Sequence, residues 1–363
     1  MKIRLILVLL LMAGVSVSAQ PRKTENIFII TLDGFRWQEL YTGADSLLVE
    51  NKEFVHDPEA LKSRFWANTP LERRKILMPF FWNTIAAQGQ LYGNRKFDNK
   101  VDCSNSMWFS YPGYSEILCG FADDENINSN KKINNPNETL LEFLNKMPDY
   151  KGKVAAFGSW DVFPFIVNEQ RSGIPVNAGF EKAGGEKLTD REKFLNTLQD
   201  EIPGPWGGVR LDAFTHYFAL EHLQKKQPDV IYIAYGETDD FAHDGRYDEY
   251  LKSAHRTDQF IGDLWNWVQS QKKYKDKTTF LITTDHGRGT QPIESWRSHG
   301  DEVAGAGQIW FAVMGPDTPP TGEQKGAGQL HQNQVAKTAA AFLGVEYKNR
   351  KAVGDVVSTS IKK

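Results

Sequence analysis

Five short runs of hydrophobic residues, rich in β-branched and aromatic side chains, end abruptly in polar residues or glycine. These runs are NIFIITLDG (26–34), KVAAFGSWD (153–161), DVIYIAYGETD (229–239), TTFLITTDHG (278–287) and QIWFAVMGP (308–316). Near-continuous apolar strands are typical of parallel sheets that are buried on both faces. Apolar positions at helical spacing occur between and after the runs, at Pro79–Gln88, Asp248–Gln271 and Gln334–Leu343. This alternation predicts an α/β fold with a largely parallel central sheet flanked by helices.

Two stretches do not fit this alternation, residues 36–75 and 164–208. The first is rich in charged and aromatic side chains, and the second carries the segments NAGFEKAGGEK and EIPGPWGG. Segments of this length in a compact fold are usually lids or binding segments. We interpret both as cap insertions at the carboxyl-terminal edge of the sheet, within a single catalytic domain that spans residues 20–363.

Residues 1–19 have the pattern of a secretory signal peptide. Lys2 and Arg4 precede an apolar stretch from about Leu5 to Val15, and small residues then lead to Ala19. We predict cleavage near Ala19 and export of the mature protein to the periplasm or the medium. The apolar stretch is short for a bilayer and no later segment rivals it, so we expect no transmembrane span.

Composition narrows the functional classes. Hydrophobic residues make up 40% of the chain and charged residues 25%, with a net charge of −3, which is typical of a soluble globular protein. This balance provides no basic surface for a nucleic-acid polymer. Cys103 and Cys119 are the two cysteines. Export would allow a disulfide between them, but Cys119 lies on the apolar face of a predicted helix, which favours two free thiols. The oligomeric state stays open.

A set of aspartate and histidine residues occurs at or near the ends of the predicted strands. Its members are Asp33 in TLDGFRW, Asp239 and His243 in ETDDFAHDG, Asp285 and His286 in TTDHGRG, and His299 in SWRSHGDE. The four-residue spacing from Asp239 to His243 puts both side chains on one face of a helix. Functional groups in open α/β sheets collect beyond the carboxyl ends of the strands. Mixed carboxylate and imidazole ligands suit Zn²⁺ best, with Mn²⁺ or Fe as alternatives.

The segment SYPGYSEILCG, residues 110–120, begins a predicted helix with a serine. Ser110 is either an N-cap, the commoner role at a helix start, or a nucleophile at the positive end of the helix dipole. Ser115 is the rival nucleophile in this stretch, but it lies inside the helical run. The remaining histidines fit ordinary core or surface positions: His56, His216, His222, His255 and His331.

The order Asp, Ser, Asp-x-x-x-His, Asp-His, His resembles that of the alkaline phosphatase superfamily. LDGFR, residues 32–36, is similar to the start of its type I phosphodiesterase/nucleotide pyrophosphatase branch, and Ser110 keeps the ten-residue spacing to Gly120. The resemblance covers most of the mature chain and implies an alkaline-phosphatase-like fold with Ser110 as the nucleophile. It also implies two divalent metal ions, with Zn²⁺ favoured. One ion would be held by Asp33, Ser110, Asp285 and His286, and the other by Asp239, His243 and His299.

The chain departs from the family patterns at positions that bear on the substrate. Gly113 stands where the phosphodiesterases carry an asparagine, and GSWDVFP lacks the Lys and Arg of some phosphomonoesterases. Arg288 is a candidate for the missing positive charge. Tyr114 replaces the arginine that sulfatases need beside their modified residue, which disfavours a sulfatase. The chain is also too short for the inserted domain of the related phosphoglycerate mutases.

Three tryptophans, Trp108, Trp160 and Trp296, lie beside these motifs. Tryptophans often serve as core residues, but we expect at least one of the three to line a leaving-group pocket. We therefore predict an exported, metal-dependent hydrolase of small-molecule phosphoesters that acts through a phosphoseryl intermediate on two metal ions. Monoester and diester substrates both stay open. A phosphoryl or phosphoalcohol transferase, or a metal-binding protein that has lost catalysis, are the alternatives.

Overall fold

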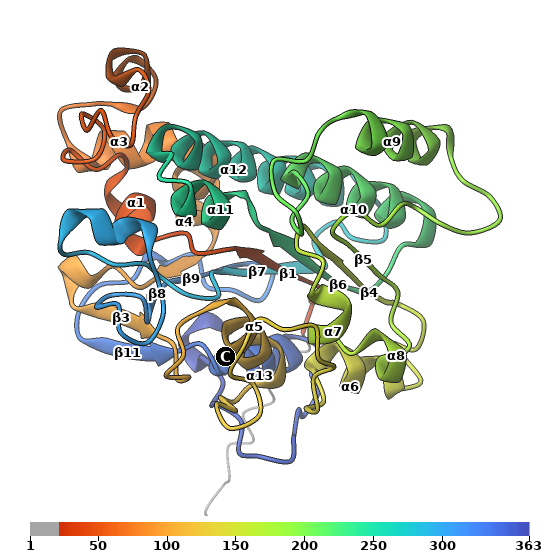
Figure 1. Ribbon diagram of the computed structural model, residues 1–363. Coiled ribbons are helices and arrows are strands. Elements are labelled where there is room, and N and C mark those ends of the chain that lie inside the picture. The colour runs from red at the N-terminus through yellow and green to blue at the C-terminus, as the bar shows by residue number, and fades with distance from the viewer. Residues whose placement is uncertain (1–21, 363) are drawn as a thin grey trace, which may run out of the picture.

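A computed structural model describes residues 22–362 of the chain (Figure 1). The predicted signal peptide, residues 1–19, therefore lies outside the described residues. Within 22–362, no helix is both long and apolar enough to cross a membrane. Cys103 and Cys119 are both buried and are not bonded to each other, as the sequence favours.

An eight-stranded sheet runs through the centre of the molecule in the order β10-β2-β9-β7-β1-β6-β4-β5. Its strands are β1 (Asn26–Leu32), β2 (Gln90–Tyr92), β4 (Val154–Gly158), β5 (Val176–Ala178), β6 (Val230–Tyr235), β7 (Thr278–Thr283), β9 (Phe311–Met314) and β10 (Gly322–Glu323). The five strands from β7 to β5 are mutually parallel. Strand β9 is antiparallel to both of its neighbours, β7 and β2. The prediction of a largely parallel central sheet is confirmed.

A small second sheet has the order β11-β3-β8, formed by Gly328–His331, Asn99–Asp102 and Gln308–Ile309. The apolar run at 308–316 is therefore divided between two sheets, with β8 in the small sheet and β9 in the large one. Trp310, between the two strands, is fully buried, and its indole N–H donates to the carbonyl of Phe35 at 2.8 Å. A single apolar run thus connects the two sheets.

Alternating side chains of the central strands pack into two separate hydrophobic cores. On β1, Phe28, Ile30 and Leu32 belong to one core, whereas Ile27 and Ile29 belong to the other. This follows from the two-residue period of a strand whose faces are both covered by helices. Figure 1 shows α10 (Asp212–Lys226) and α12 (Tyr247–Ser270) on one side of the sheet. On the other side lie α5 (Ser110–Cys119), α6 (Leu140–Lys146), α7 (Phe163–Ile166) and α13 (Gln334–Phe342).

All three segments with helical spacing form helix, but one of them is not a regular α-helix. The patterns at 248–271 and 334–343 correspond to α12 and α13. The pattern at 79–88 instead forms a π-helical turn, η1 (Phe81–Ile85), followed by one turn of α-helix, α4 (Ala86–Gln88). At its start, the buried Asp258 carboxylate on α12 accepts hydrogen bonds from the backbone N–H groups of Phe80 and Phe81. This tertiary contact anchors the irregular turn.

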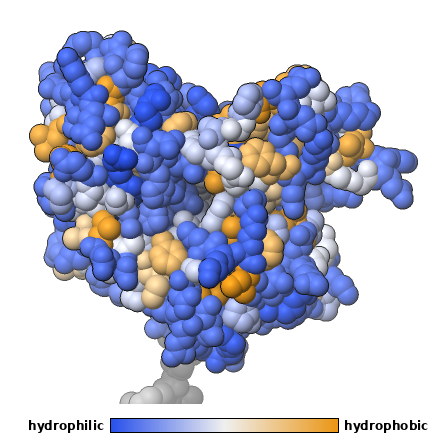
Figure 2. Space-filling view, in the orientation of Figure 1, coloured by the Kyte–Doolittle hydropathy of each residue, from blue (hydrophilic) through white to orange (hydrophobic). Residues whose placement is uncertain are grey.

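The two expected cap insertions differ in structure. Residues 36–75 hold α1 (Trp37–Thr42), α2 (Pro58–Phe65) and most of α3 (Pro70–Leu77). Residues 164–208 hold α8 (Glu169–Ser172), β5 and α9 (Asp190–Glu201). Because β5 pairs with β4, part of this second stretch belongs to the central sheet and is not an insertion. Figure 2 shows a mostly hydrophilic face, hollowed between the lobe of α2 and α3 and the lobe of α9.

Candidate active site

Three neighbouring parallel strands carry the candidate ligands to one edge of the sheet. Asp33 directly follows β1, and Asp285 and His286 follow β7 after one residue. Strand β6 leads through Gly236 into the short helix α11 (Glu237–His243), which presents Asp239 and His243. Since β6, β1 and β7 are adjacent and parallel, their carboxyl ends converge. The apolar runs that form these strands thus end at the edge of the sheet where functional residues usually lie in open α/β folds.

Asp33, Asp285 and His286 form a first cluster whose ligand atoms lie within 4.8 Å of one another. His286 Nε2 lies 3.3 Å from Asp33 Oδ1 and 3.5 Å from Asp285 Oδ2. All three side chains are buried. The backbone carbonyl of Gly287 lies 2.8 Å from His286 Nδ1, so that nitrogen carries the proton. The Nε2 lone pair therefore points at the carboxylates, as a metal ligand requires.

Ser110 is the first residue of α5, and the residue in the N-cap position is Phe109. The Ser110 side chain is therefore free of the capping role, and its Oγ lies 3.4 Å from His286 Nε2. Ser115, the rival, is buried inside α5, where it accepts a hydrogen bond from the Asn135 amide at 3.1 Å. Of the two serines, Ser110 is the one that reaches the first cluster.

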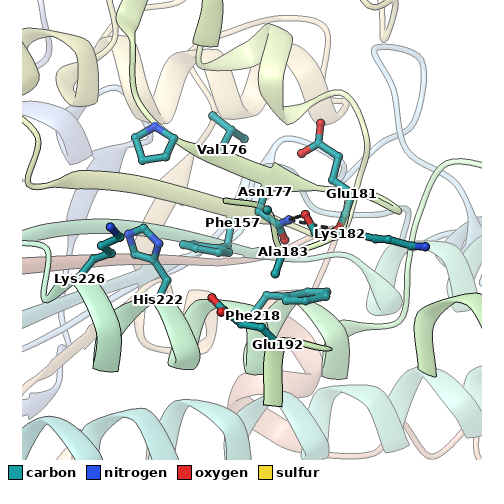
Figure 3. A pocket seen from close by; sticks show the side chains of 12 residues that line it. Phe157, Val176, Asn177, Glu181, Lys182, Ala183, Glu192, Phe218, His222 and Lys226 are labelled. Carbon is teal, nitrogen blue, oxygen red and sulfur yellow. Dashed lines mark hydrogen bonds between the residues drawn. The ribbon is translucent and has the colours of Figure 1, made fainter. Parts of the chain in front are cut away.

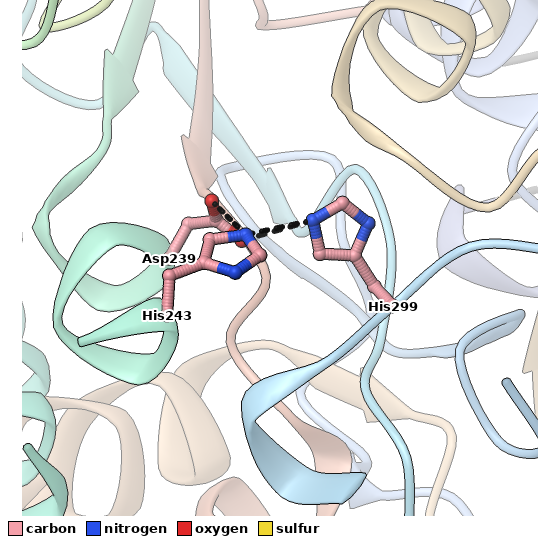
Figure 4. A group of neighbouring side chains, drawn as sticks. All are labelled: Asp239, His243 and His299. Carbon is pink, nitrogen blue, oxygen red and sulfur yellow. Dashed lines mark hydrogen bonds and ion pairs between the residues drawn. The ribbon is translucent and has the colours of Figure 1, made fainter. Parts of the chain in front are cut away.

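A second cluster consists of Asp239, His243 and His299 (Figure 4). His243 Nε2 lies 3.2 Å from Asp239 Oδ2 and 2.9 Å from His299 Nε2. His243 is the outermost member, with 47% of its side chain exposed. Asp239 also lies beside the first cluster, because its Oδ1 is 3.7 Å from His286 Nε2. The two clusters are therefore adjacent parts of one site.

Several titratable groups of this site have pKa values far from their ordinary ones. Burial, followed by the nearby charge of Asp239, raises the pKa of Asp33 well above its usual range. Burial and the charge of Asp33 do the same to the pKa of Asp285. Burial acts in the same direction on Asp239, but the charge of Arg288 holds its pKa well below the usual value. Burial lowers the pKa of His299 to about 2.

The residues fit two divalent cations. Among residues 22–362, no hydrogen-bond donor reaches the buried atoms Asp33 Oδ1 and Asp285 Oδ2 of the first cluster. Buried carboxylate oxygens without a donor are costly unless a cation compensates them. Carboxylates and neutral imidazoles together are a donor set that suits zinc and similar borderline metals.

Arg288 does not face a substrate, which corrects its prediction as a substrate-binding residue. The side chain is fully buried. Its guanidinium donates to the carbonyls of Gly34 at 3.2 Å, Arg297 at 2.7 Å and Asp239 at 3.0 Å, and it also pairs with the Asp239 carboxylate. Four of its five N–H groups are used in these contacts, so Arg288 supports the second cluster and does not bind substrate.

The three tryptophans divide into one core residue and two candidates. Trp296 is fully buried, in edge contacts with the rings of Phe54 and Tyr247. It cannot line a leaving-group pocket, which corrects that prediction. Trp108 and Trp160 are half-buried. Trp108 lies two residues before Ser110, and Trp160 follows the end of β4, so both stay candidates for substrate contact.

Helix α5 carries two further site residues, Tyr114 and Gly113, which the sequence analysis names only as departures from family patterns. The Tyr114 hydroxyl donates to Asp33 Oδ2 at 2.8 Å, and its spacing of one helical turn from Ser110 was an available signal. A Cβ at Gly113 would overlap the carbonyl oxygen of Asp285. Only glycine therefore lets α5 approach the loop after β7 this closely. The departure from the asparagine of the family pattern serves this close packing.

Asn130 is a residue beside the candidate nucleophile that the sequence analysis did not identify. Its side-chain oxygen accepts the backbone N–H of Tyr111 at 3.0 Å, directly beside Ser110. The residue is exposed, so its amide NH₂ remains available to an oxygen next to the nucleophile. The loop from which it comes has no regular structure, and no periodic pattern in it would indicate contact with α5.

A cavity of about 520 Å³ lies elsewhere, between the β4–β5 edge and the C-terminal half of α10 (Figure 3). Phe157, Phe218 and His222 provide its aromatic lining. No ligand candidate of the two clusters is among its described lining residues. The cavity is therefore separate from the site.

A family model of type I phosphodiesterase / nucleotide pyrophosphatase matches residues 48–311. The chain belongs to this family. The matched segment includes Ser110, both residues of the Asp-His pair and the whole second cluster, while Asp33 precedes it. A search of curated proteins finds no significant match.

Solved structures place this family member among alkaline-phosphatase folds. The alkaline phosphatase PafA matches with a TM-score of 0.61 at 10% identity, over 95% of this chain and 100% of PafA. The lipoteichoic acid synthase LtaP from Listeria monocytogenes matches with 0.58 at 16% identity, over 96% and 80%. The phosphonate monoester hydrolase SpPMH from Silicibacter pomeroyi matches with 0.54 at 13% identity, over 92% and 76%. The predicted fold and the predicted type I phosphodiesterase / nucleotide pyrophosphatase branch are confirmed. Family membership supports a phosphoester hydrolase or a related activity.

Proposed function

We propose that the protein is an exported, metal-dependent phosphodiesterase that acts on small phosphoesters through a covalent phosphoseryl intermediate. The observation that carries the proposal is the position of Ser110. Its hydroxyl stands at the N-terminus of α5, 3.4 Å from His286 Nε2. A free serine hydroxyl is a weak nucleophile, and this position is where a bound cation and the helix dipole would activate it.

Two divalent ions would be held by the two clusters, with Zn²⁺ favoured. The first ion would take Asp33, Asp285, His286 and Ser110 as ligands, and the second Asp239, His243 and His299. Such ions lower the pKa of bound hydroxyl groups and compensate the negative charge of a transferring phosphoryl group.

The proposed reaction proceeds in two steps at Ser110. Ser110 Oγ releases its proton to solvent and forms a bond to phosphorus, while the bond from phosphorus to the leaving oxygen breaks. The leaving alkoxide takes a proton from solvent. A water then attacks the phosphoserine, the Ser110 Oγ–P bond breaks, and Ser110 recovers its proton. The amide of Asn130 and the N-terminus of α5 are positioned to stabilise a non-bridging phosphate oxygen.

A diester fits the charges around the site better than a monoester does. The fully buried Arg288 uses four of its five N–H groups within the protein. Lys132, on the segment that follows Asn130, is paired at 2.6 Å with Asp161, just beyond β4. A diester carries one negative charge fewer than a monoester and needs fewer cations outside the metal site.

The experiment compares nitrophenyl phosphate with bis(nitrophenyl) phosphate on metal-replete protein. We expect faster turnover of the bis-ester, and loss of at least about a thousand-fold in kcat for Ser110→Ala, as for removal of other catalytic nucleophiles. Ser115→Ala, from the same helix, is the matched control and should keep most of the activity. Ser110→Ala activity within about tenfold of wild type would remove Ser110 as the nucleophile.

A further inference from the structure

Behind α5 lies a buried polar network that neither the metal clusters nor the proposed nucleophile uses. It consists of Glu116, Asn105 and Gln332, whose exposed fractions are 0%, 1% and 0%. Glu116 belongs to α5, Asn105 to the segment between β3 and α5, and Gln332 to the turn between β11 and α13. Three polar side chains buried together carry a desolvation cost, which their hydrogen bonds must offset.

Glu116 ties the segment before the nucleophile to α5. Its carboxylate accepts from the backbone N–H of Ser104 at 2.9 Å, and from the backbone and side-chain N–H groups of Asn105, both at 2.7 Å. Glu116 lies on the helix that Ser110 starts. The contacts therefore hold the chain that enters α5 against the body of the same helix.

Asn105 is the centre of the network, because all four of its side-chain hydrogen-bonding positions are used. Its Oδ1 accepts from the backbone N–H groups of Met107 at 3.2 Å and Trp108 at 3.0 Å. Its Nδ2 donates to Glu116 at 2.7 Å and to Gln332 Oε1 at 3.4 Å. A carboxylate at this position would have no donors, and an apolar side chain would satisfy none of the four partners.

From Asn105, two routes lead to the candidate metal ligands. Gln332 donates through Nε2 to the backbone carbonyls of Thr284 at 3.0 Å and Asp285 at 2.6 Å. Trp108, held by Asn105 at a φ of +50°, accepts the N–H of Gly300 at 3.0 Å. Gly300 is the residue after His299. One buried asparagine thus links the start of α5 to the segments that bear Asp285 and His299.

We infer that Asn105, with Glu116 and Gln332, is a positioning centre that fixes the nucleophile helix relative to both metal clusters. The inference rests on the proposed function for its catalytic consequence. Displacement of a nucleophile by about 1 Å costs on the order of a hundredfold in rate, so the network acts on kcat and leaves ground-state binding unchanged.

The test uses Asn105→Ala and the nearly isosteric Gln332→Met in the full-length protein. Asn137→Ala is the matched control, because Asn137 is equally buried and donates to Asp123, away from the three linked segments. We expect kcat with bis(nitrophenyl) phosphate to fall about 10- to 100-fold in the two test variants, with KM within about twofold. Asn137→Ala should lose thermal stability and keep its kcat.

Amide hydrogen exchange supplies a second readout that needs no activity. We expect the Gly300 amide to exchange at least about tenfold faster in Asn105→Ala, because its acceptor at Trp108 is released. The same amide should be unchanged in Asn137→Ala. Equal exchange and equal kcat in Asn105→Ala and Asn137→Ala would overturn the inference. If wild-type protein hydrolyses neither ester, the proposed function fails, and the exchange comparison still decides whether the network holds these segments.

Discussion

At the scale of single residues, Arg288 shows how a buried charge sets the properties of a site it does not enter. Its guanidinium contacts the Asp239 carboxylate and holds the pKa of Asp239 low, against the effect of burial. It also donates to Gly34, which follows Asp33. Arg288 therefore supports one ligand of the second cluster and the loop that carries a ligand of the first.

Arg288→Met should weaken metal binding at the second cluster by about 10- to 100-fold, as loss of outer contacts to metal ligands generally does. A competition titration of zinc against a chelator measures this without any substrate. Arg297→Met is the control, because the Arg297 side chain contacts the backbone carbonyl of His243 at 3.3 Å, and Arg288 contacts the backbone carbonyl of Arg297, which the substitution keeps. Equal zinc affinity in the two variants would contradict the supporting role of Arg288.

Removal of metal is the second prediction at this scale. Chelation should abolish hydrolysis, and Zn²⁺ should restore it better than Mg²⁺, because three of the seven candidate ligands are imidazoles. Elemental analysis of the active protein should find close to two metals per chain. A single Ca²⁺ or Mg²⁺ would show that the assignment of two clusters is wrong.

The sequence identifies site residues well where their chemistry is specific and poorly where burial decides their role. Asp33, Asp239 and His299 are named from residue type and order alone, and the structure places them in the two clusters. Arg288 and Trp296 cannot be assigned in this way, because the sequence does not show that their side chains point into the protein.

At the scale of secondary structure, the position of helix α5 depends on Gly113, which has no side chain. Gly113 lies against the carbonyl of Asp285, where a Cβ would overlap it. Helix and loop are in direct contact there, so a change in one moves the other. The contact sets how far Ser110, three residues earlier, stands from His286.

Gly113→Ala should therefore destabilise the protein by about 1–3 kcal/mol, the usual cost of overpacking, and should lower turnover. Chemical denaturation and the bis-ester assay measure the two effects. Gly184→Ala is the matched control, since nothing lies within 4 Å of a Cβ at Gly184. A Gly113→Ala variant as stable and active as Gly184→Ala would exclude the tight contact.

Elements were predictable from sequence in proportion to their length and regularity. The long strands follow directly from their near-continuous apolar runs, and α12 follows from its helical period. Strand β5 has three residues, and the π-helical turn at Phe81–Ile85 has the same apolar composition as an α-helix, so neither has a distinct pattern. Helix α9 was missed although its capping box, Thr189 with Glu192, is present in the sequence.

At the scale of the whole molecule, a buried histidine makes stability depend on pH. His216 is 1% exposed, stacks on Phe260 at 4.2 Å, and has Nδ1 3.1 Å from the Tyr235 hydroxyl. Burial lowers its pKa to about 4, against about 6.5 for a free histidine. Between these values the unfolded chain binds a proton that the folded protein does not. Stability therefore falls as the pH drops from about 6.5 to about 4.

Between pH 7 and pH 5 this group should cost about 2 kcal/mol of the free energy of unfolding. His216→Gln should lose less stability than wild type over that interval, which urea denaturation at the two pH values measures. His331→Gln, at an exposed position, should keep the wild-type difference. The prediction fails if His216→Gln also shows the wild-type difference in stability between the two pH values.

Strand β1 has a consequence for how the chain folds. It is the first strand of the described chain, yet it pairs on its two sides with β6 and β7, which follow it by more than half the length of the chain. Contacts this distant in sequence slow folding, because a long loop must close before any pairing is gained. One edge of β1 stays unpaired until residues 230–235 are available, and the other edge until residues 278–283 are available. A nascent or truncated chain that ends earlier presents an open hydrophobic strand, which makes it a target for chaperones and a seed for aggregation.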